Sequence, residues 1–213
     1  MMTEHVLPGD IEKRSFEIIA EELSSMGISL DPEQDPVIRR AIHTSADFDY
    51  AKTLHFSQDA VRIARDLIAR GADIITDTNM ALTGINKKRL AAYEGQVRCY
   101  MAEESVADEA KERGLTRAAV SMEHAAGDIT ESGTRAIFAV GNAPTALITL
   151  RKLYDDGIFR PDFVIGVPVG FVNVTEAKEL ILETDIPCII NRGRKGGSNI
   201  AAAIVNALLY GMK

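Results

Sequence analysis

The chain has 213 residues, of which 46% are hydrophobic and 26% charged, and 24 Lys and Arg against 31 Asp and Glu give a net charge of −7. This length suits one α/β domain with a sizeable core. The sequence has no run of about 18 apolar residues, which excludes a membrane-spanning helix, and its acidic balance argues against a general nucleic-acid binder.

The first residues of the chain indicate the cellular compartment, and the two cysteines limit the redox chemistry that the protein can carry out. Residues 1–5 have neither the basic start nor the apolar stretch of a signal peptide, so we expect a cytoplasmic protein. Cys99 and Cys188 form no CxxC pair, which excludes a disulfide scaffold and a thiolate zinc site. Both lie in apolar, strand-like runs, and we expect them in the core rather than at a reactive site.

The first 70 residues carry mainly helical patterns. Two Asp-Pro pairs precede a helix that ends near His43. We expect Ser57 to cap another helix, which Gly71 ends. We expect this helical segment, about 8–70, to pack on the same sheet as the rest of a single domain that spans residues 1–213.

From residue 73 onward, short β-branched runs alternate with longer helical patterns. This alternation predicts βα units and a mostly parallel sheet of about five strands. The expected strands are Asp73–Asp77, Val97–Met101, Ala136–Val140, Phe163–Val167 and Cys188–Asn191. The helical segments expected between and after them are Glu103–Arg113, a segment from Thr116 onward, 142–156 and Asn199–Tyr210.

Two glycine-containing turns lead from an expected strand into a helix. They stand out because the sequence has no GxGxxG after a strand, no P-loop GxxxxGK motif, no GxSxG and no HExxH. The first turn, Val140–Leu147, can direct free backbone N–H groups at a ligand on the carboxyl edge of a parallel sheet, where anions bind. A capped helix with Pro144 at its first position is the alternative interpretation.

The second turn, Asn191–Asn199, combines three cations with three glycines and is the stronger candidate for an anion site. Arg192, Arg194 and Lys195 can pair with carboxylates or phosphates, and glycine allows a close approach of the backbone. A solvated surface loop is the alternative interpretation.

Polar residues also follow the first expected strand. The segment Asp77–Met80 falls on the carboxyl edge of the sheet, where ligands of α/β proteins bind. The alternative is an Asx turn that only ends the strand.

Among the four histidines, His43 has the strongest catalytic pattern. Arg40 lies three residues earlier, so a guanidinium that can hold an acid group shares a helix face with a side chain that titrates near neutral pH. A metal site that pairs His43 with Asp47 is the alternative, although the sequence offers no third ligand. The other histidines are expected in structural places: His5 and His124 at the surface or at a cap, and His55 packed between apolar neighbours.

Seven segments, from about Pro8 to Leu209, carry a pattern that is specific because of its order along the chain. They are Glu12–Phe16, Arg40–His43, Asp77–Met80, Thr116–Ala118, Gly141–Leu147, Gly166–Val172 and Gly193–Ser198. Together they resemble the precorrin-8X methylmutase family of cobalamin biosynthesis, whose members are also called cobalt-precorrin-8 methylmutases.

The resemblance implies an isomerase that moves a methyl group from C-11 to C-12 of a tetrapyrrole, giving hydrogenobyrinic acid, or cobyrinic acid when cobalt is already in the ring. It implies a three-layer α/β/α fold and a homodimer with the polycarboxylate substrate at the dimer interface. No cofactor is expected, since the methyl group comes from the substrate, and any cobalt belongs to the substrate too. We expect no metal site of the protein's own, no nucleic acid and no membrane partner.

By the same resemblance, His43 is the catalytic general acid that protonates the macrocycle so that the methyl group can migrate. Such proton transfer typically contributes about 10²–10⁴-fold. The carboxylates on the rim of the substrate explain local cations in an acidic chain. The expected substrate-binding residues are Ser15, Arg40, Asp77, Arg117, Asn142, Arg194, Lys195, Gly196, Gly197 and Ser198.

Two other functions stay open at this point. A non-catalytic tetrapyrrole carrier would bind the corrin acid without isomerising it. An unrelated α/β enzyme would use the two glycine turns for a nucleotide phosphate, and the missing nucleotide motifs weigh against it.

Overall fold

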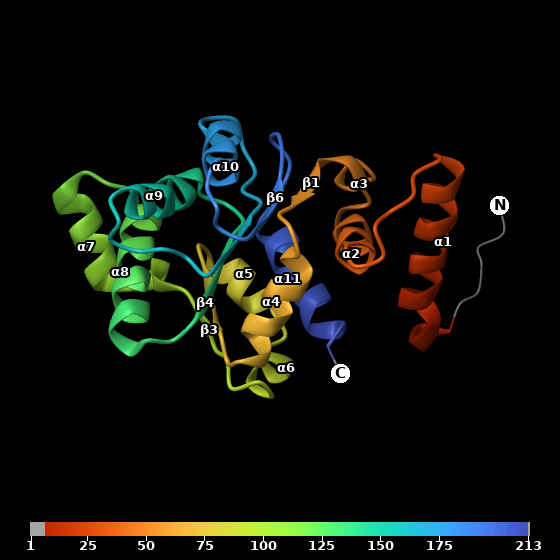
Figure 1. Cartoon of the computed structure of the whole chain (residues 1–213), viewed down its shortest axis with the longest axis horizontal. Helices are drawn as coiled ribbons and strands as arrows, with labels where there is room; N and C mark the ends of the chain where they lie inside the picture. The colour runs from red at the N-terminus through yellow and green to blue at the C-terminus, as the bar shows by residue number, and fades with distance from the viewer. Residues whose placement is uncertain (1–6, 213) are drawn as a thin grey trace.

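Among the residues that the structure describes, six strands form one sheet, with helices covering both of its faces (Figure 1). The computed structural model describes residues 7–212 of the chain. The strands lie in the order β1-β6-β5-β4-β2-β3, and neighbours are parallel except for β1, which runs antiparallel to β6. The predicted α/β class with a mostly parallel sheet is therefore confirmed. The strand bounds are β1 Leu54–Phe56, β2 Asp73–Thr76, β3 Val97–Arg98, β4 Ala136–Val140, β5 Phe163–Gly166 and β6 Cys188–Asn191.

Strand β1 is the strand that the sequence does not predict. It has three residues and lies between segments with helical patterns. A strand of this length is too short to show the alternation of apolar and polar residues that would identify it. Leu54 is buried, His55 is exposed and Phe56 is half-buried. The expectation that His55 packs in the core is wrong, because the pleat of this edge strand turns its side chain to solvent.

Three predicted strands run past the carboxyl ends of the observed ones. Beyond β2, Asp77 leaves the ladder and its carboxylate accepts amides from the next turn. Beyond β3, Tyr100–Ala102 forms a 3₁₀ turn. Beyond β5, the carbonyl of Val167 accepts from Gly197 N, 2.9 Å away, instead of continuing the strand. All three differences fall at the carboxyl edge of the sheet.

The helices divide into two layers with one core on each face of the sheet. Side chains of α2, α4 and α11 share one core with alternate strand residues, and side chains of α7 to α10 share the other. In β4, Ile137 and Ala139 join the first core, whereas Phe138 and Val140 join the second. This alternation confirms the expected three layers. The helix bounds are η1 Pro8–Asp10, α1 Ile11–Ser25, α2 Asp35–Ser45, α3 Tyr50–Thr53, α4 Ala60–Ala69, α5 Asn79–Gly84, α6 Lys87–Ala91, η2 Tyr100–Ala102, α7 Glu104–Arg113, α8 Arg117–Ser132, α9 Pro144–Asp155, α10 Val174–Leu182 and α11 Ser198–Tyr210.

Helix α1 stands at one end of the molecule, and α2 lies between it and the sheet (Figure 1). Only Ile19 and Leu23 of α1 are buried, whereas Ile11 and Ile18 are exposed. The helix is therefore held mainly by its contact with α2, the helix that carries His43.

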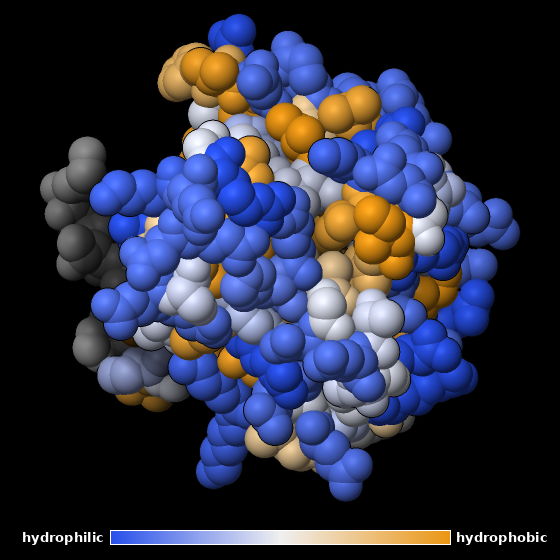
Figure 2. Space-filling view, turned by 90° about the vertical axis from the view of Figure 1, so that its left-hand side faces the viewer, coloured by the Kyte–Doolittle hydropathy of each residue, from blue (hydrophilic) through white to orange (hydrophobic). Residues whose placement is uncertain are grey.

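The opposite end of the molecule carries α7 and α8, and Figure 2 looks onto it. Hydrophilic side chains cover most of this face, and hydrophobic ones form small separate patches. Within residues 7–212, no helix combines the length and the apolar character needed to cross a bilayer.

The order of the sheet reverses between β2 and β4. Strand β3 is added on one side of β2, and β4, β5 and β6 follow on the other side. In open α/β sheets, such a reversal leaves a crevice at the carboxyl ends of the two strands, and ligands bind there. Here the crevice lies where Asp77 follows β2 and Gly141 follows β4.

Candidate active site

The carboxylate of Asp77 fills the crevice between β2 and β4. Its Oδ1 accepts the N–H of Gly141 at 2.9 Å, and its Oδ2 accepts those of Asn142 at 2.8 Å and Ala143 at 2.6 Å. Asp77 is fully buried, and burial raises its pKa while the three amides oppose that rise. The expected free N–H groups of this turn are therefore already taken. The alternative interpretation is confirmed, since α9 begins with Pro144 and the protein itself supplies the anion at its start.

The two glycine turns pack against each other at the carboxyl edge. A Cβ on Gly141 would lie 2.6 Å from Cα of Ser198, so only glycine allows this approach. The Ser198 hydroxyl lies 2.8 Å from that of Thr78, which also accepts Ala81 N and so caps α5. The predicted neighbours Asp77, Asn142 and Ser198 are thus brought together at one place.

The loop Arg192–Gly197 fits closely over the end of β5. A Cβ on Gly196 would lie 2.0 Å from the carbonyl oxygen of Val167. Gly196 and Gly197 have φ angles of +157° and +139°, which L side chains rarely adopt. The backbone of this predicted anion loop is therefore fixed by contacts that glycine alone permits.

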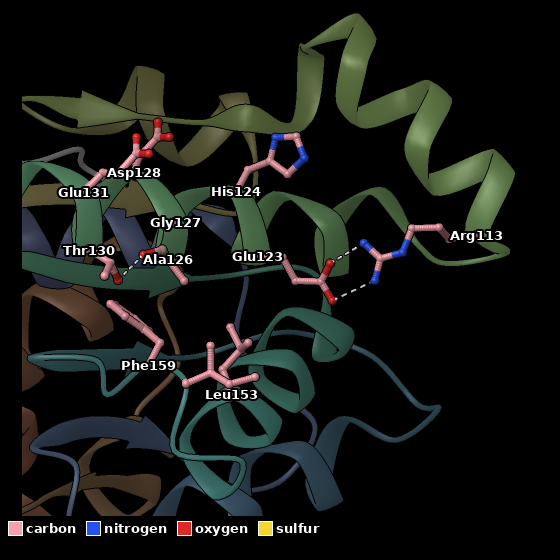
Figure 3. A pocket seen from close by; sticks show the side chains of 11 residues that line it. Arg113, Glu123, His124, Ala126, Gly127, Asp128, Thr130, Glu131, Leu153 and Phe159 are labelled. Carbon is pink, nitrogen blue, oxygen red and sulfur yellow. Dashed lines mark hydrogen bonds and ion pairs between the residues drawn. The ribbon is translucent and has the colours of Figure 1, made fainter.

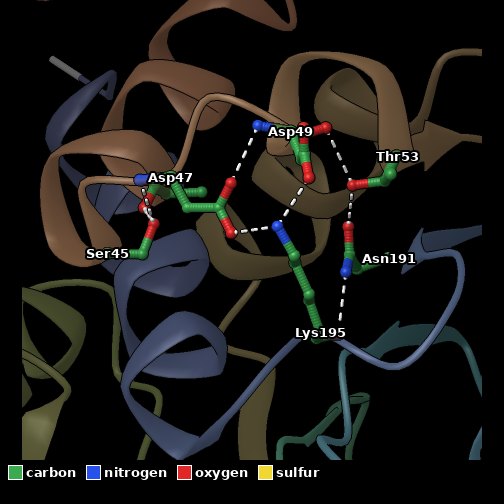
Figure 4. Close-up of polar contacts among 7 residues, drawn as sticks. Ser45, Asp47, Asp49, Thr53, Asn191 and Lys195 are labelled. Carbon is green, nitrogen blue, oxygen red and sulfur yellow. Dashed lines mark hydrogen bonds and ion pairs between the residues drawn. The ribbon is translucent and has the colours of Figure 1, made fainter.

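Lys195 does not present a free cation to a ligand. Its Nζ lies 2.6 Å from Oδ2 of Asp47 and 2.5 Å from Oδ2 of Asp49, and its side chain is 49% exposed (Figure 4). These two carboxylates raise the pKa of Lys195, and Lys195 lowers the pKa of Asp47. Asp47 lies four residues after His43, so this ion pair ties the end of α2 to the loop after β6.

His43 lies in the last turn of α2 with its side chain exposed. Its ring stacks on that of Phe16 in α1, with the centroids 5.1 Å apart and an angle of 14° between the planes. Within the described part of the chain, no side chain or backbone group forms a hydrogen bond with the imidazole, so both ring nitrogens can reach a ligand. The alternative metal site has no support, because Asp47 is engaged by Lys195 and residues 7–212 contain no group of three His, Cys, Asp or Glu that could hold a metal ion.

Arg40 contacts the same aromatic ring as His43. Its guanidinium carbon lies 4.7 Å from the centroid of Phe16 and 5.2 Å from that of Tyr210 in α11, and it forms an ion pair with Glu12. The side chain is 19% exposed, and its buried Nε has no hydrogen-bond partner. The predicted pairing of Arg40 with His43 on one side of α2 is confirmed, with Phe16 as the shared contact.

A cavity of about 330 Å³ joins Arg40 to the start of α11. Its walls come from α2, α5 and α11, and include Thr44, Met80 and Asn199, the residue after Ser198. Its floor is formed in part by Gly84, whose added Cβ would lie 2.9 Å from that of Ala202. The cavity therefore connects the helix of His43 with the second glycine turn.

The other expected contacts lie at the margins of this region. The Oγ of Ser15 donates to the carbonyl of Ile11, 2.9 Å away, within α1. Arg117 is exposed at the start of α8, in the layer on the other side of the sheet from α2. The Thr116 and Thr145 hydroxyls, 2.8 Å apart, join the starts of α8 and α9, so Arg117 lies near the turn that contains Asn142.

Arg194 lies over an apolar loop that sequence reasoning did not single out as functional. Its guanidinium carbon is 5.5 Å from the ring centroid of Phe171, which is 82% exposed, and Gly170 N donates to the Arg194 carbonyl at 3.1 Å. The aromatic partners Phe16 and Phe171 both lie inside segments of the family resemblance, which was the available signal for them.

Comparison with known proteins matches residues 10–211 to the family model for precorrin-8X methylmutase. The chain belongs to this family. It is 41% identical over 209 residues to the cobalt-precorrin-8 methylmutase of Salmonella typhimurium, covering 97% of this chain and 96% of that one. It is 38% identical to the precorrin-8X methylmutase of Pseudomonas aeruginosa, covering 97% and 98% of the two chains. A crystal structure of precorrin-8X methylmutase from Thermus thermophilus matches with a TM-score of 0.83 and 39% identity over 94% of each chain.

Membership of the methylmutase family decides between the functions that the sequence left open. The chain is an enzyme, an isomerase of cobalamin biosynthesis that shifts a methyl group. The comparisons favour this catalytic function over that of a non-catalytic tetrapyrrole carrier.

The methylmutase fold also has a cavity of about 690 Å³ on the opposite side of the sheet from α2 (Figure 3). It is lined by residues of α8, by Leu153 of α9 and by the segment that leads to β5, with the Arg113–Glu123 ion pair at one end. His124 lies 2.6 Å from Glu109 and so joins α8 to α7 in an ion pair when protonated. His124 is thus half-buried between two helices rather than at the surface or at a helix cap, whereas His5 lies outside the described residues.

Neither cysteine has the surroundings of a reactive thiol. Burial raises the pKa of Cys188 to about 11, and burial also raises the pKa of the half-buried Cys99. The thiolate is the reactive form, and the raised pKa values disfavour it at both side chains.

Proposed function

We propose that this chain moves the methyl group of precorrin-8X, or of its cobalt-bearing form, from C-11 to C-12, with His43 as the general acid. The observation that carries the proposal is the stack of His43 on Phe16 beside Arg40. The names of the relatives, precorrin-8X and cobalt-precorrin-8 methylmutase, support this class of substrate.

His43 has the exposure and the support that a proton donor needs. The ring of Phe16 restricts the imidazole to one plane, which leaves its edge nitrogens accessible to a flat macrocycle. Protonation withdraws electron density from the conjugated ring and so eases migration of the methyl group. General acid catalysis contributes typically about 10²–10⁴-fold, and the remaining acceleration comes from holding the ring in a reactive geometry.

We assign the carboxylate contacts to the groups that lie around the α2–α11 cavity and the second glycine turn. Arg40 and Arg194 provide the guanidinium groups, each steadied by an aromatic ring. Asp77 and Lys195 already hold protein groups, and for them we propose a positioning role at the two turns. The further proposed contacts are Ser15, Arg117, Asn142, Gly196, Gly197 and Ser198.

We further propose that the methylmutase works as a cytoplasmic homodimer without a cofactor, in which residues 1–213 form a single domain. The exposed residues Ile11 and Ile18 on the outer helix α1 give apolar surface for a contact between copies. The methyl group stays within the substrate, so the reaction requires no external donor. Sedimentation velocity of the purified protein tests the dimer.

The direct test is an absorption titration with hydrogenobyrinic acid and, separately, with cobyrinic acid. A saturable spectral shift at about one ligand per chain is expected. The tighter ligand identifies the metal-free or the cobalt-bearing route. If neither ligand shifts the spectrum while a nucleotide raises the melting temperature, the proposed function is wrong.

A further inference from the structure

Lys178 is a fully buried lysine in α10 that neither the sequence analysis nor the proposed mechanism uses. Its Nζ donates to the carbonyl of Gly193 at 2.7 Å and to that of Lys195 at 2.9 Å. Both acceptors belong to the loop Arg192–Gly197. The ammonium group of Lys178 therefore ties the second glycine turn, Asn191–Asn199, to helix α10.

The carbonyl groups of Gly193, Arg194 and Lys195 each accept a hydrogen bond from a donor outside the loop. Besides the two bonds from Lys178, Asn191 Nδ2 donates to the Lys195 carbonyl at 2.8 Å, and Gly170 N donates to the Arg194 carbonyl at 3.1 Å. The N–H groups of residues 193–196 have no acceptor within the part of the chain that the structure describes. Three successive carbonyl groups of the loop thus face donors of the protein, whereas the N–H groups of residues 193–196 are left without an acceptor among residues 7–212.

An apolar side chain of the same length would fill this position without the cost of removing a charge from water. That cost is visible in the ammonium itself, because burial lowers the pKa of Lys178 to about 8. The two carbonyl groups that Lys178 binds belong to no helix or strand. The lysine therefore stabilises the loop and not the sheet.

We propose that Lys178 is a positioning residue that holds the Arg192–Gly197 loop in the form that binds a carboxylate of the substrate. This inference rests on the proposed function for the identity of the ligand, a corrin carboxylate. Lys178 acts through the loop, since its own Nζ is covered by the two carbonyls and by the core.

The binding test compares three variants in the absorption titration with hydrogenobyrinic acid. Lys178→Met keeps an unbranched side chain one heavy atom shorter and removes the donors, whereas Lys178→Gln keeps two N–H donors without the charge. Ile181→Val is the matched control, because Ile181 is fully buried in the same helix and its apolar side chain belongs to the core of the α7–α10 layer. We expect Lys178→Met to raise the dissociation constant about tenfold or more, Lys178→Gln to raise it less, and the control to leave it unchanged.

Turnover separates positioning from a general loss of structure. We expect Lys178→Met to raise KM about tenfold and to change kcat by less than about threefold, because His43 lies on another element. A general loss of active protein would instead lower kcat and leave KM unchanged. Equal KM values for folded Lys178→Met and the unmodified protein overturn the inference.

Trypsin tests the loop without any corrin, since Arg192, Arg194 and Lys195 give it three cleavage sites. We expect cleavage in the loop to become about tenfold faster in Lys178→Gln than in Ile181→Val, because the freed loop opens more often. Equal rates overturn the inference even if Lys178→Met does not fold. If the unmodified protein binds no corrin while the loop of Lys178→Gln is cleaved faster, the proposed function fails and the holding of the loop by Lys178 stands.

Discussion

The imidazole of His43 lies almost parallel to the ring of Phe16, with 5.1 Å between the centroids and 14° between the planes. These residues come from two helices, α2 and α1, that pack against each other outside the sheet layer. The orientation of the proposed acid therefore depends on how α1 docks on α2, and much less on the sheet itself.

Replacement of His43 by alanine should abolish turnover and leave the binding of product largely intact. The imidazole contributes mainly in the transition state, so we expect kcat to fall by about 10²–10⁴-fold. Single-turnover assays and a titration with product measure the two effects. His55→Ala is the matched control, because His55 is also exposed and lies on the edge strand β1. Normal turnover in His43→Ala would falsify the assigned role.

Loss of either guanidinium at the site should weaken binding instead. Arg40→Ala and Arg194→Ala each remove a charge-assisted hydrogen bond, which costs about 1–3 kcal/mol, or roughly 5–150-fold in the dissociation constant. Arg62→Ala is the control, since Arg62 is an exposed arginine on α4 that pairs with Asp59. Unchanged affinity in both site variants removes these arginines from the substrate contacts.

Two of the three glycines in the second turn, Gly193 and Gly196, should respond differently to alanine. Both have positive φ angles, but a Cβ on Gly196 meets the carbonyl of Val167 at 2.0 Å, whereas one on Gly193 meets nothing within 4 Å. We expect Gly193→Ala to cost about 1–2 kcal/mol in the free energy of unfolding from backbone strain alone. Gly196→Ala should cost more and should also weaken product binding. Denaturant unfolding checks this order, and equal costs would contradict the described packing.

Replacement of Asp77 by asparagine should destabilise the fold. The NH₂ group of asparagine would face one or two of the amides that now donate to a carboxylate oxygen, which leaves buried donors unpaired. We expect a loss of about 3 kcal/mol in the free energy of unfolding. Asp162→Asn is the milder control, because Asp162 accepts one backbone amide and an exposed arginine. A loss no larger than that of the control would show that the crevice tolerates a neutral side chain.

Lys178 should make the stability depend on pH in a defined window. Its pKa is about 8 in the folded chain and 10.5 in the reference state, so the unfolded chain binds more protons between these values and stability rises with pH. Between pH 8 and pH 9, the titration of Lys178 should raise the free energy of unfolding by about 1 kcal/mol. The difference in unfolding free energy between the unmodified protein and Lys178→Met isolates this change from the thiols and tyrosines. A difference that is constant over this window would contradict the burial of a charged lysine.

The sequence predicted those parts of the fold and site that depend on local patterns. The parallel strands follow from apolar runs of β-branched residues, and the meeting of Arg40 and His43 follows from their spacing of three on one helix. The filling of the first glycine turn depends on Asp77, which lies 64 residues before Gly141. Lys195 likewise finds its carboxylates 148 and 146 residues away in the chain. Local sequence carries no signal for such partners, so both turns looked open to ligands.

Asp77 also bears on which ligands this sheet excludes. A free phosphate that approached the start of α9 would compete with a carboxylate that the chain itself tethers within 3 Å of the same amides. A tethered group acts at an effective concentration far above that of cellular metabolites. The position at which related architectures bind nucleotides is therefore occupied by a carboxylate of the protein itself.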